Sequence, residues 1–132
     1  MTELLSTPWG PAQHIRTIAP GIEVLSTASH GGVHLTGEPA AAFRRAFPLF
    51  QPFAADYTPG YQSNGAHIWL EEDLDAGLAF AFFESEFADS YPHQAQAFCC
   101  AHRSYFERRG ALLPEAWFAH ASEAARNPST IE

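Results

Sequence analysis

The sequence predicts an α+β fold, an antiparallel sheet of about five strands with two to three helices packed on it, the longest near the C-terminus. Short runs with period-two alternation dominate the first half of the chain, and runs with helical spacing dominate the second. Apolar residues make up 46% of the 132 residues and aromatic residues 14%, enough for a core without disulfides. We expect a single domain over residues 1–132, with residues 1–7 and 127–132 frayed.

Short strands are predicted in the first third of the chain, at residues 13–19, 22–27 and 33–36. Pro20-Gly21 is a turn signal that joins the first two strands into a hairpin. Gly31-Gly32 permits a bulge or a tight bend before the third strand.

Residues 38–47 predict the first helix, because Pro39 suits its first turn and Phe43 and Phe47 fall on an apolar stripe. Residues 48–65 show no regular pattern, but four aromatic side chains there predict contacts with the core or a short helix.

Residues 67–83 can be interpreted in two ways. Large residues alternate with alanines from residue 78 to residue 82, and this favours two strands joined by an acidic turn. Alternatively, the acidic run starts a buried helix, since carboxylates favour a helix N-terminus. The alternation and Gly77 lead us to predict the strands.

Two helices are predicted at the C-terminal end. Residues 92–109 form the strongest candidate, with apolar residues at helical spacing, Pro92 in the first turn and Gly110 as a stop. A last helix is expected over residues 114–126.

The charge balance limits the possible partners. Fifteen acidic residues outnumber seven basic ones, all arginines, for a net charge of −8. This disfavours direct nucleic-acid binding. Neither a signal peptide nor a membrane span is evident, and the adjacent Cys99 and Cys100 are expected to be free thiols, so we expect a cytoplasmic location and no membrane contact.

Ser29-His30-Gly31-Gly32 is the most suggestive short motif. Serine beside histidine, followed by flexible backbone, fits the nucleophile and oxyanion roles of a hydrolase. Neighbours on an extended chain point to opposite faces, however, so a turn-forming role is favoured. If the protein is an enzyme, the catalytic candidates are Ser29, His30, Glu72 and Asp73, assisted by Glu71.

A metal site is a weaker hypothesis. His30 and His34 lie four residues apart and would share a strand face. A mixed nitrogen–oxygen set would be completed if the fold brings Glu71, Glu72, Asp73 or His67 close. The sequence alone does not show that these segments meet. We therefore expect no cofactor, and keep His30, His34 and Glu71 as minor candidates.

Seven carboxylates lie within residues 71–89, with no basic residue among them. On one side of the protein they would create a field of one sign, and the matching partner is a basic protein surface. Otherwise they only keep the domain soluble. The candidate binding residues are Trp9, His30, Glu71, Glu72, Asp73, Asp75, Glu84 and Glu86.

Trp9-Gly10-Pro11-Ala12, Ser29-His30-Gly31-Gly32 and Glu71-Glu72-Asp73 occur together in this chain. The combination resembles an uncharacterised domain of unknown function found in proteins of bacterial plasmids, prophages and other mobile elements. The resemblance covers residues 7–36 and 66–87. An aromatic often precedes the two glutamates in that family, where this chain has Leu70. The resemblance implies a mobile-element setting, in which proteins often counter host defence, but no catalytic residues.

These observations lead to two hypotheses. The first is a non-enzymatic accessory protein of a mobile element that binds a basic partner protein through an acidic face. Such a protein would inhibit host defence of the restriction or CRISPR type. The second is a small hydrolase, metal-assisted or not, that uses the residues named above. A homodimer is compatible with the aromatic-rich stretch at residues 47–61, which fits an interface as well as a cover for the core.

Overall fold

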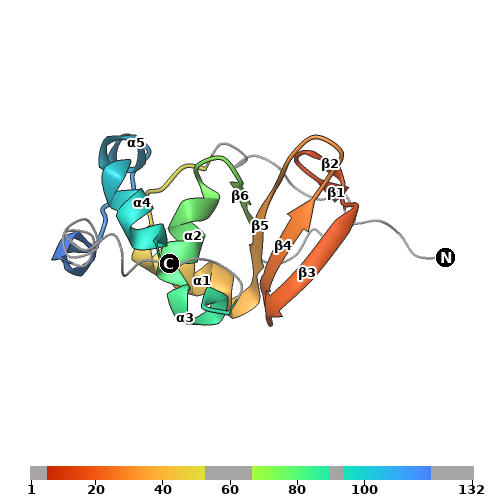
Figure 1. Cartoon of the computed structure of the whole chain (residues 1–132), viewed down its shortest axis with the longest axis horizontal. Helices are drawn as coiled ribbons and strands as arrows, with labels where there is room; N and C mark the ends of the chain where they lie inside the picture. Colours follow the sequence, from red (N-terminus) through yellow and green to blue (C-terminus); the bar gives the residue numbers. More distant parts are fainter. Residues whose placement is uncertain (1–5, 53–66, 90–93, 120–132) are drawn as a thin grey trace.

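The computed structural model describes residues 6–52, 67–89 and 94–119. Its main sheet is antiparallel, with the strand order β3-β4-β5-β6 (Figure 1). The strands are β3 (His14–Ala19), β4 (Ile22–Ser26), β5 (Gly31–Thr36) and β6 (His67–Glu71). The short strands β1 (Ser6–Thr7) and β2 (Gly10–Pro11) form a separate two-stranded ribbon. The α+β class is therefore confirmed, but the main sheet has four strands in the described residues, not about five.

The predicted hairpin is confirmed as β3 and β4. Gly21 turns the chain with a φ of 84°, a backbone conformation that residues with a Cβ rarely adopt. The predicted third strand begins two residues earlier than expected, at Gly31. A bulge between Thr17 and Ala19 interrupts the β3–β4 register.

Helices cover one face of the sheet (Figure 1). They are α1 (Gly37–Ala46), α2 (Ala76–Phe82), α3 (Glu84–Phe87), α4 (Ala95–Ala101) and α5 (Arg103–Arg108). Helices α1 and α2 pack on β5 and β6, and α4 packs on α2. Val33 and Leu35 of β5 and Ile68 and Leu70 of β6 belong to the core between the sheet and these helices.

Residues 76–82 form helix α2, so the predicted second strand of the 67–83 segment is wrong and the helical alternative is confirmed. Five of the seven residues of α2 are buried, and a helix that is apolar all round belongs inside the protein. Phe98 of α4 packs directly against Gly77, where an added Cβ would lie 2.7 Å from its ring. The apolar run at residues 76–82 is too short for its periodicity to distinguish a strand from a helix.

The predicted long C-terminal helix is divided in two. His102, between α4 and α5, leaves the helical conformation, and its Nδ1 donates to the Phe98 carbonyl over 3.0 Å. The longest helix of the described residues is consequently α1, not one near the C-terminus. Gly110 ends α5 with a φ of 97°, as expected.

Other predictions fall partly outside the described residues. Residues 115–119 are helical, and residues 120–126 of the predicted last helix lie outside, as do most of residues 48–65. Of the ends predicted to be frayed, residues 1–5 and 127–132 lie outside, whereas Ser6 and Thr7 form β1, so the prediction is wrong for these two residues. No helix in the described ranges has the length and apolar character that a bilayer crossing requires.

Candidate functional site

The loop between β4 and β5 is held by one threonine side chain. The Thr27 hydroxyl donates to the His30 carbonyl over 2.8 Å and accepts the backbone N–H groups of Ser29 and His30. A second bond joins Thr27 N to the His30 carbonyl over 2.7 Å. The loop therefore orients the His30 backbone, and the turn-forming interpretation of this motif is supported.

The sheet register brings this loop to the end of β6. Gly32 lies opposite Glu71, and the Glu72 N–H donates to the Gly31 carbonyl over 2.9 Å. His30, Glu71 and Glu72 each offer one atom that could bind a metal, and these three atoms lie within 4.8 Å of one another. Residues some 40 positions apart in the sequence thus form a single cluster.

Glu71 is the most constrained carboxylate of this cluster. Its side chain is only 19% exposed, and desolvation by burial raises its pKa. Oε2 accepts the backbone N–H of Asp73 over 3.3 Å, whereas Oε1 has no hydrogen-bond partner in the described part of the chain. His30 Nδ1 lies 3.6 Å from Oε1, too far for a hydrogen bond but within ion-pair distance when the imidazole is protonated.

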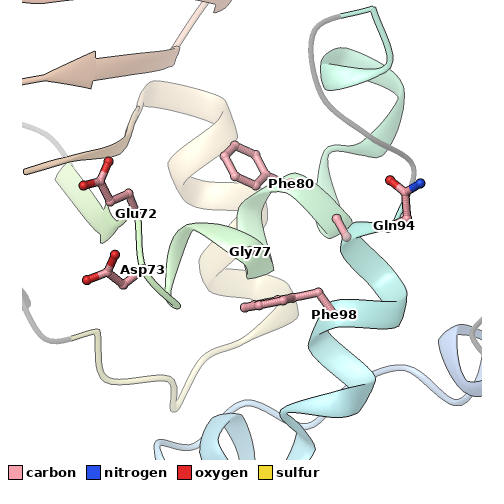
Figure 2. Close-up of a pocket in the computed structure, with 7 residues that line it drawn as sticks. Glu72, Asp73, Gly77, Phe80, Gln94 and Phe98 are labelled. Atoms are coloured by element: carbon pink, nitrogen blue, oxygen red, sulfur yellow. The ribbon is translucent and has the colours of Figure 1, made fainter. Parts of the chain in front are cut away.

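A cavity of about 260 Å³ opens beside the β6–α2 turn. Figure 2 shows the carboxylates of Glu72 and Asp73 on one side of it and Gln94 on the other. The rings of Phe80 and Phe98 belong to its largely apolar lining. The cavity therefore combines an apolar wall with exposed negative charge at one end.

A second cavity of about 420 Å³ lies between the β3–β4 hairpin and α2. His14 and Arg16 of the edge strand contribute to it, and Glu72 and Phe80 line both cavities. Glu72 thus belongs both to the cluster with His30 and Glu71 and to the lining of the two cavities.

Ser29 lies on the exposed loop, and no contact between its hydroxyl and His30 is found among the described residues. The proposed serine–histidine pair is therefore not brought together. Cys99 is buried, which raises the pKa of its thiol to about 12, so it does not serve as a thiolate nucleophile at neutral pH.

The carboxylates predicted to form one acidic face are separated. Asp75 is 1% exposed and accepts the Tyr105 hydroxyl, so it is a core residue. Glu84 and Glu86 belong to α3, at the far end of α2 from Glu72 (Figure 1). Of the carboxylates in the described residues, Glu71 and Glu72 lie beside His30.

Trp9 and His34 lie on the outer face of the sheet, opposite the helices. Trp9 contacts Gly32, where an added Cβ would lie 2.7 Å from the indole, and meets Trp69 edge to face. His34 is buried and does not join His30.

Sequence reasoning missed a chain of polar contacts on this face, centred on the buried His34. His34 Nδ1 lies 3.2 Å from Glu23 Oε1, and His34 Nε2 lies 2.8 Å from His67 Nδ1. Trp69 stacks on the His34 ring, with 3.7 Å between ring centroids. Glu23, His34 and Trp69 are directly opposite one another on three strands, but alternation within one strand does not reveal its neighbours.

Comparison with known proteins gives one match. A family model described as a domain of unknown function, DUF7007, matches residues 2–130. No curated protein and no solved structure matches the chain. The match spans nearly the whole sequence, and the chain therefore belongs to the DUF7007 family.

Proposed function

We propose that this domain is a non-enzymatic binding protein that engages a basic segment of a partner protein at the β6–α2 turn. The observation that carries the proposal is the cavity whose apolar lining ends at Glu72 and Asp73. An arginine or lysine side chain fits such a lining, because its stem is apolar and its head is cationic. Phe80 and Phe98 offer ring faces for the same cation.

The charge distribution supports the same partner class. Glu72 and Asp73 are exposed, and no ion pair to arginine is found for either within the described residues. The net charge of −8 attracts a basic segment before contact is made. The turn and the adjoining cavity then provide a defined docking point.

The more specific part of the proposal concerns the setting. The resemblance to domains of mobile elements supports a partner from a host-defence system, of restriction or CRISPR type, since such proteins carry basic nucleic-acid-binding surfaces. The free thiols of Cys99 and Cys100 support a cytoplasmic site of action.

A metal-assisted hydrolase is the second candidate. The proximity of His30, Glu71 and Glu72 favours this candidate, because one imidazole and two carboxylates could bind one metal ion. The position of Ser29 does not support the serine-based form of that mechanism. A screen of ester and phosphodiester substrates with the Ser29→Ala and His30→Ala variants tests it, and the second candidate requires activity that His30→Ala abolishes.

The binding proposal is tested with a synthetic arginine-rich peptide, titrated calorimetrically at 50 and 300 mM NaCl. We expect the Glu72→Gln/Asp73→Asn double variant to bind about tenfold more weakly than wild type, since each exposed carboxylate–guanidinium pair contributes up to about 1 kcal/mol. High salt should weaken wild-type binding as well.

The matched control is the Glu84→Gln/Glu86→Gln double variant, which removes the same charge at the far end of α2. It should bind like wild type. Equal losses in both double variants would show that only net charge matters, and salt-independent binding would contradict an electrostatic mechanism.

A further inference from the structure

We propose that His30, Glu71 and Glu72 form a binding site for a divalent first-row metal ion such as Mn²⁺ or Zn²⁺. One imidazole and two carboxylates offer ligand atoms within 4.8 Å of one another. The inference goes beyond the proposed binding function and shares only Glu72 with the cavity that function uses.

The separation of two of the ligands fits a shared ion. His30 Nδ1 and Glu71 Oε1 are 3.6 Å apart, which is too long for a hydrogen bond. Two ligands that each lie about 2.1 Å from a tetrahedral zinc ion are about 3.4 Å from each other. The 3.6 Å separation is close to that value.

The unsatisfied oxygen of Glu71 is the second observation. Oε1 is fully buried and accepts no hydrogen bond from the described residues, although such oxygens nearly always have a partner. The other oxygen, Oε2, is held by the Asp73 N–H, as the second oxygen of a metal-ligating carboxylate commonly is. A cation at Oε1 would supply the missing interaction.

The backbone around the ligands is fixed by hydrogen bonds. The His30 N–H donates to Thr27 Oγ1 over 3.1 Å, and the Glu72 N–H donates to the Gly31 carbonyl over 2.9 Å. Preorganisation of this kind favours metal binding, because fewer groups must be ordered when the ion arrives.

Gly31 explains how Glu72 approaches the strand. A Cβ at this position would lie 3.0 Å from Glu72 Oε2 and 2.7 Å from the Leu25 carbonyl oxygen. A glycine is therefore needed for the carboxylate to lie alongside β5 at the cluster.

The ligand set selects the class of ion. A mixed nitrogen–oxygen set suits Mn²⁺, Fe²⁺ or Zn²⁺, whereas Mg²⁺ and Ca²⁺ prefer sets made of oxygen alone. Three protein ligands leave at least one coordination position for water or for a group of a bound partner.

The test is a titration of the full chain with MnCl₂, followed by electron paramagnetic resonance, and with ZnCl₂, followed by calorimetry. We expect one site per chain. His30→Ala and Glu72→Gln should each weaken binding at least tenfold, whereas Ser29→Ala and Glu86→Gln, which change an adjacent and a distant surface residue, should bind like wild type.

A measurement without substitutions guards against misfolded variants. Mn²⁺ should broaden the amide NMR signals of residues 30–31 and 71–72 of the wild-type chain before all others. Absence of saturable binding, broadening centred elsewhere, or full affinity in a folded His30→Ala variant would overturn the site. Asp73→Asn should weaken peptide binding and spare the metal, and His30→Ala should do the reverse, so failure of one proposal is distinguishable from failure of the other.

Discussion

Two histidine–glutamate groups on the outer face of the sheet differ in how fully their polar atoms are satisfied. In the middle of the sheet, His34 uses both ring nitrogens, one toward Glu23 and one toward His67. At the end of the sheet, His30 is half exposed and lies near a Glu71 oxygen that accepts no hydrogen bond in the described residues. The same residue types thus stabilise the fold where hydrogen bonds join them and point to a ligand where a buried oxygen lacks one.

Protonation states follow from this pairing. The Glu23 carboxylate accepts from Nδ1 of His34, so Nε2 of the neutral ring accepts from Nδ1 of His67. A second proton on His34 would require His67 to move its ring proton from Nδ1 to Nε2, so that its Nδ1 could accept. Desolvation by burial lowers the pKa of His34, and the charge of Glu23 only partly opposes it.

The largest expected effect is a difference between the His34 and His30 variants in the free energy of unfolding. His34→Ala should lower the free energy of unfolding by about 2–4 kcal/mol, because it leaves a cavity beside Trp69 and removes the partner of Glu23. His30→Ala should change the free energy of unfolding by less than about 0.5 kcal/mol, as expected for a surface residue. Urea denaturation at pH 8 measures both, and equal effects would contradict the comparison.

The pH dependence of stability should come from the buried group. Because the folded-state pKa of His34 lies below its ordinary value of 6.5, the unfolded chain binds the proton more readily. The contribution of neutral His34 is therefore complete above pH 6.5 and is lost as the pH falls from 6.5 toward the folded-state pKa.

Urea denaturation between pH 8 and pH 5 checks this direction. His34→Gln, which keeps a donor and an acceptor but does not titrate, should flatten the pH profile, whereas His30→Gln should leave it unchanged. An unchanged profile in His34→Gln would assign the acid sensitivity to other groups.

The smallest expected effect concerns Glu71. Its folded-state pKa is raised, so its contribution to stability is present at low pH and is lost as the pH rises through that pKa. Glu71→Gln should therefore stabilise the metal-free protein at pH 7, by up to about 0.5 kcal/mol.

Saturating Mn²⁺ should make wild type more stable than the Glu71→Gln variant. An ion that binds only the folded state stabilises it, and wild type should gain more than Glu71→Gln. Thermal denaturation with and without Mn²⁺ measures both quantities, and a Glu71→Gln variant that gains as much as wild type would remove Glu71 from the proposed site.

Local patterns predicted those parts of the fold that local interactions stabilise. Pro20-Gly21 marked the turn of the hairpin, and the apolar stripe with Phe43 and Phe47 marked helix α1. Residues 76–82 were misassigned because alternating alanines fit a strand as well as a buried helix. The packing of Phe98 on Gly77, from a distant helix, decides between them.

The metal hypothesis shows the same limit. Spacing of four on a strand puts His30 and His34 on one face but about 13 Å apart, which is too far for one ion. The sequence named His30, His34 and several possible carboxylate partners, Glu71 and Glu72 among them, whereas the structure groups His30 with Glu71 and Glu72 and not with His34.

The sequence by itself determined the hairpin, helix α1, the excess of negative charge and the residue types available for chemistry. These features depend on composition and on neighbours within a few positions. The tertiary structure decided which of these residues meet, because the β5–β6 register that sets Gly32 opposite Glu71 joins segments almost 40 residues apart. The same register sets His34 opposite Trp69, so that one histidine is buried under stacked rings and the other, at the end of the sheet, is a candidate ligand.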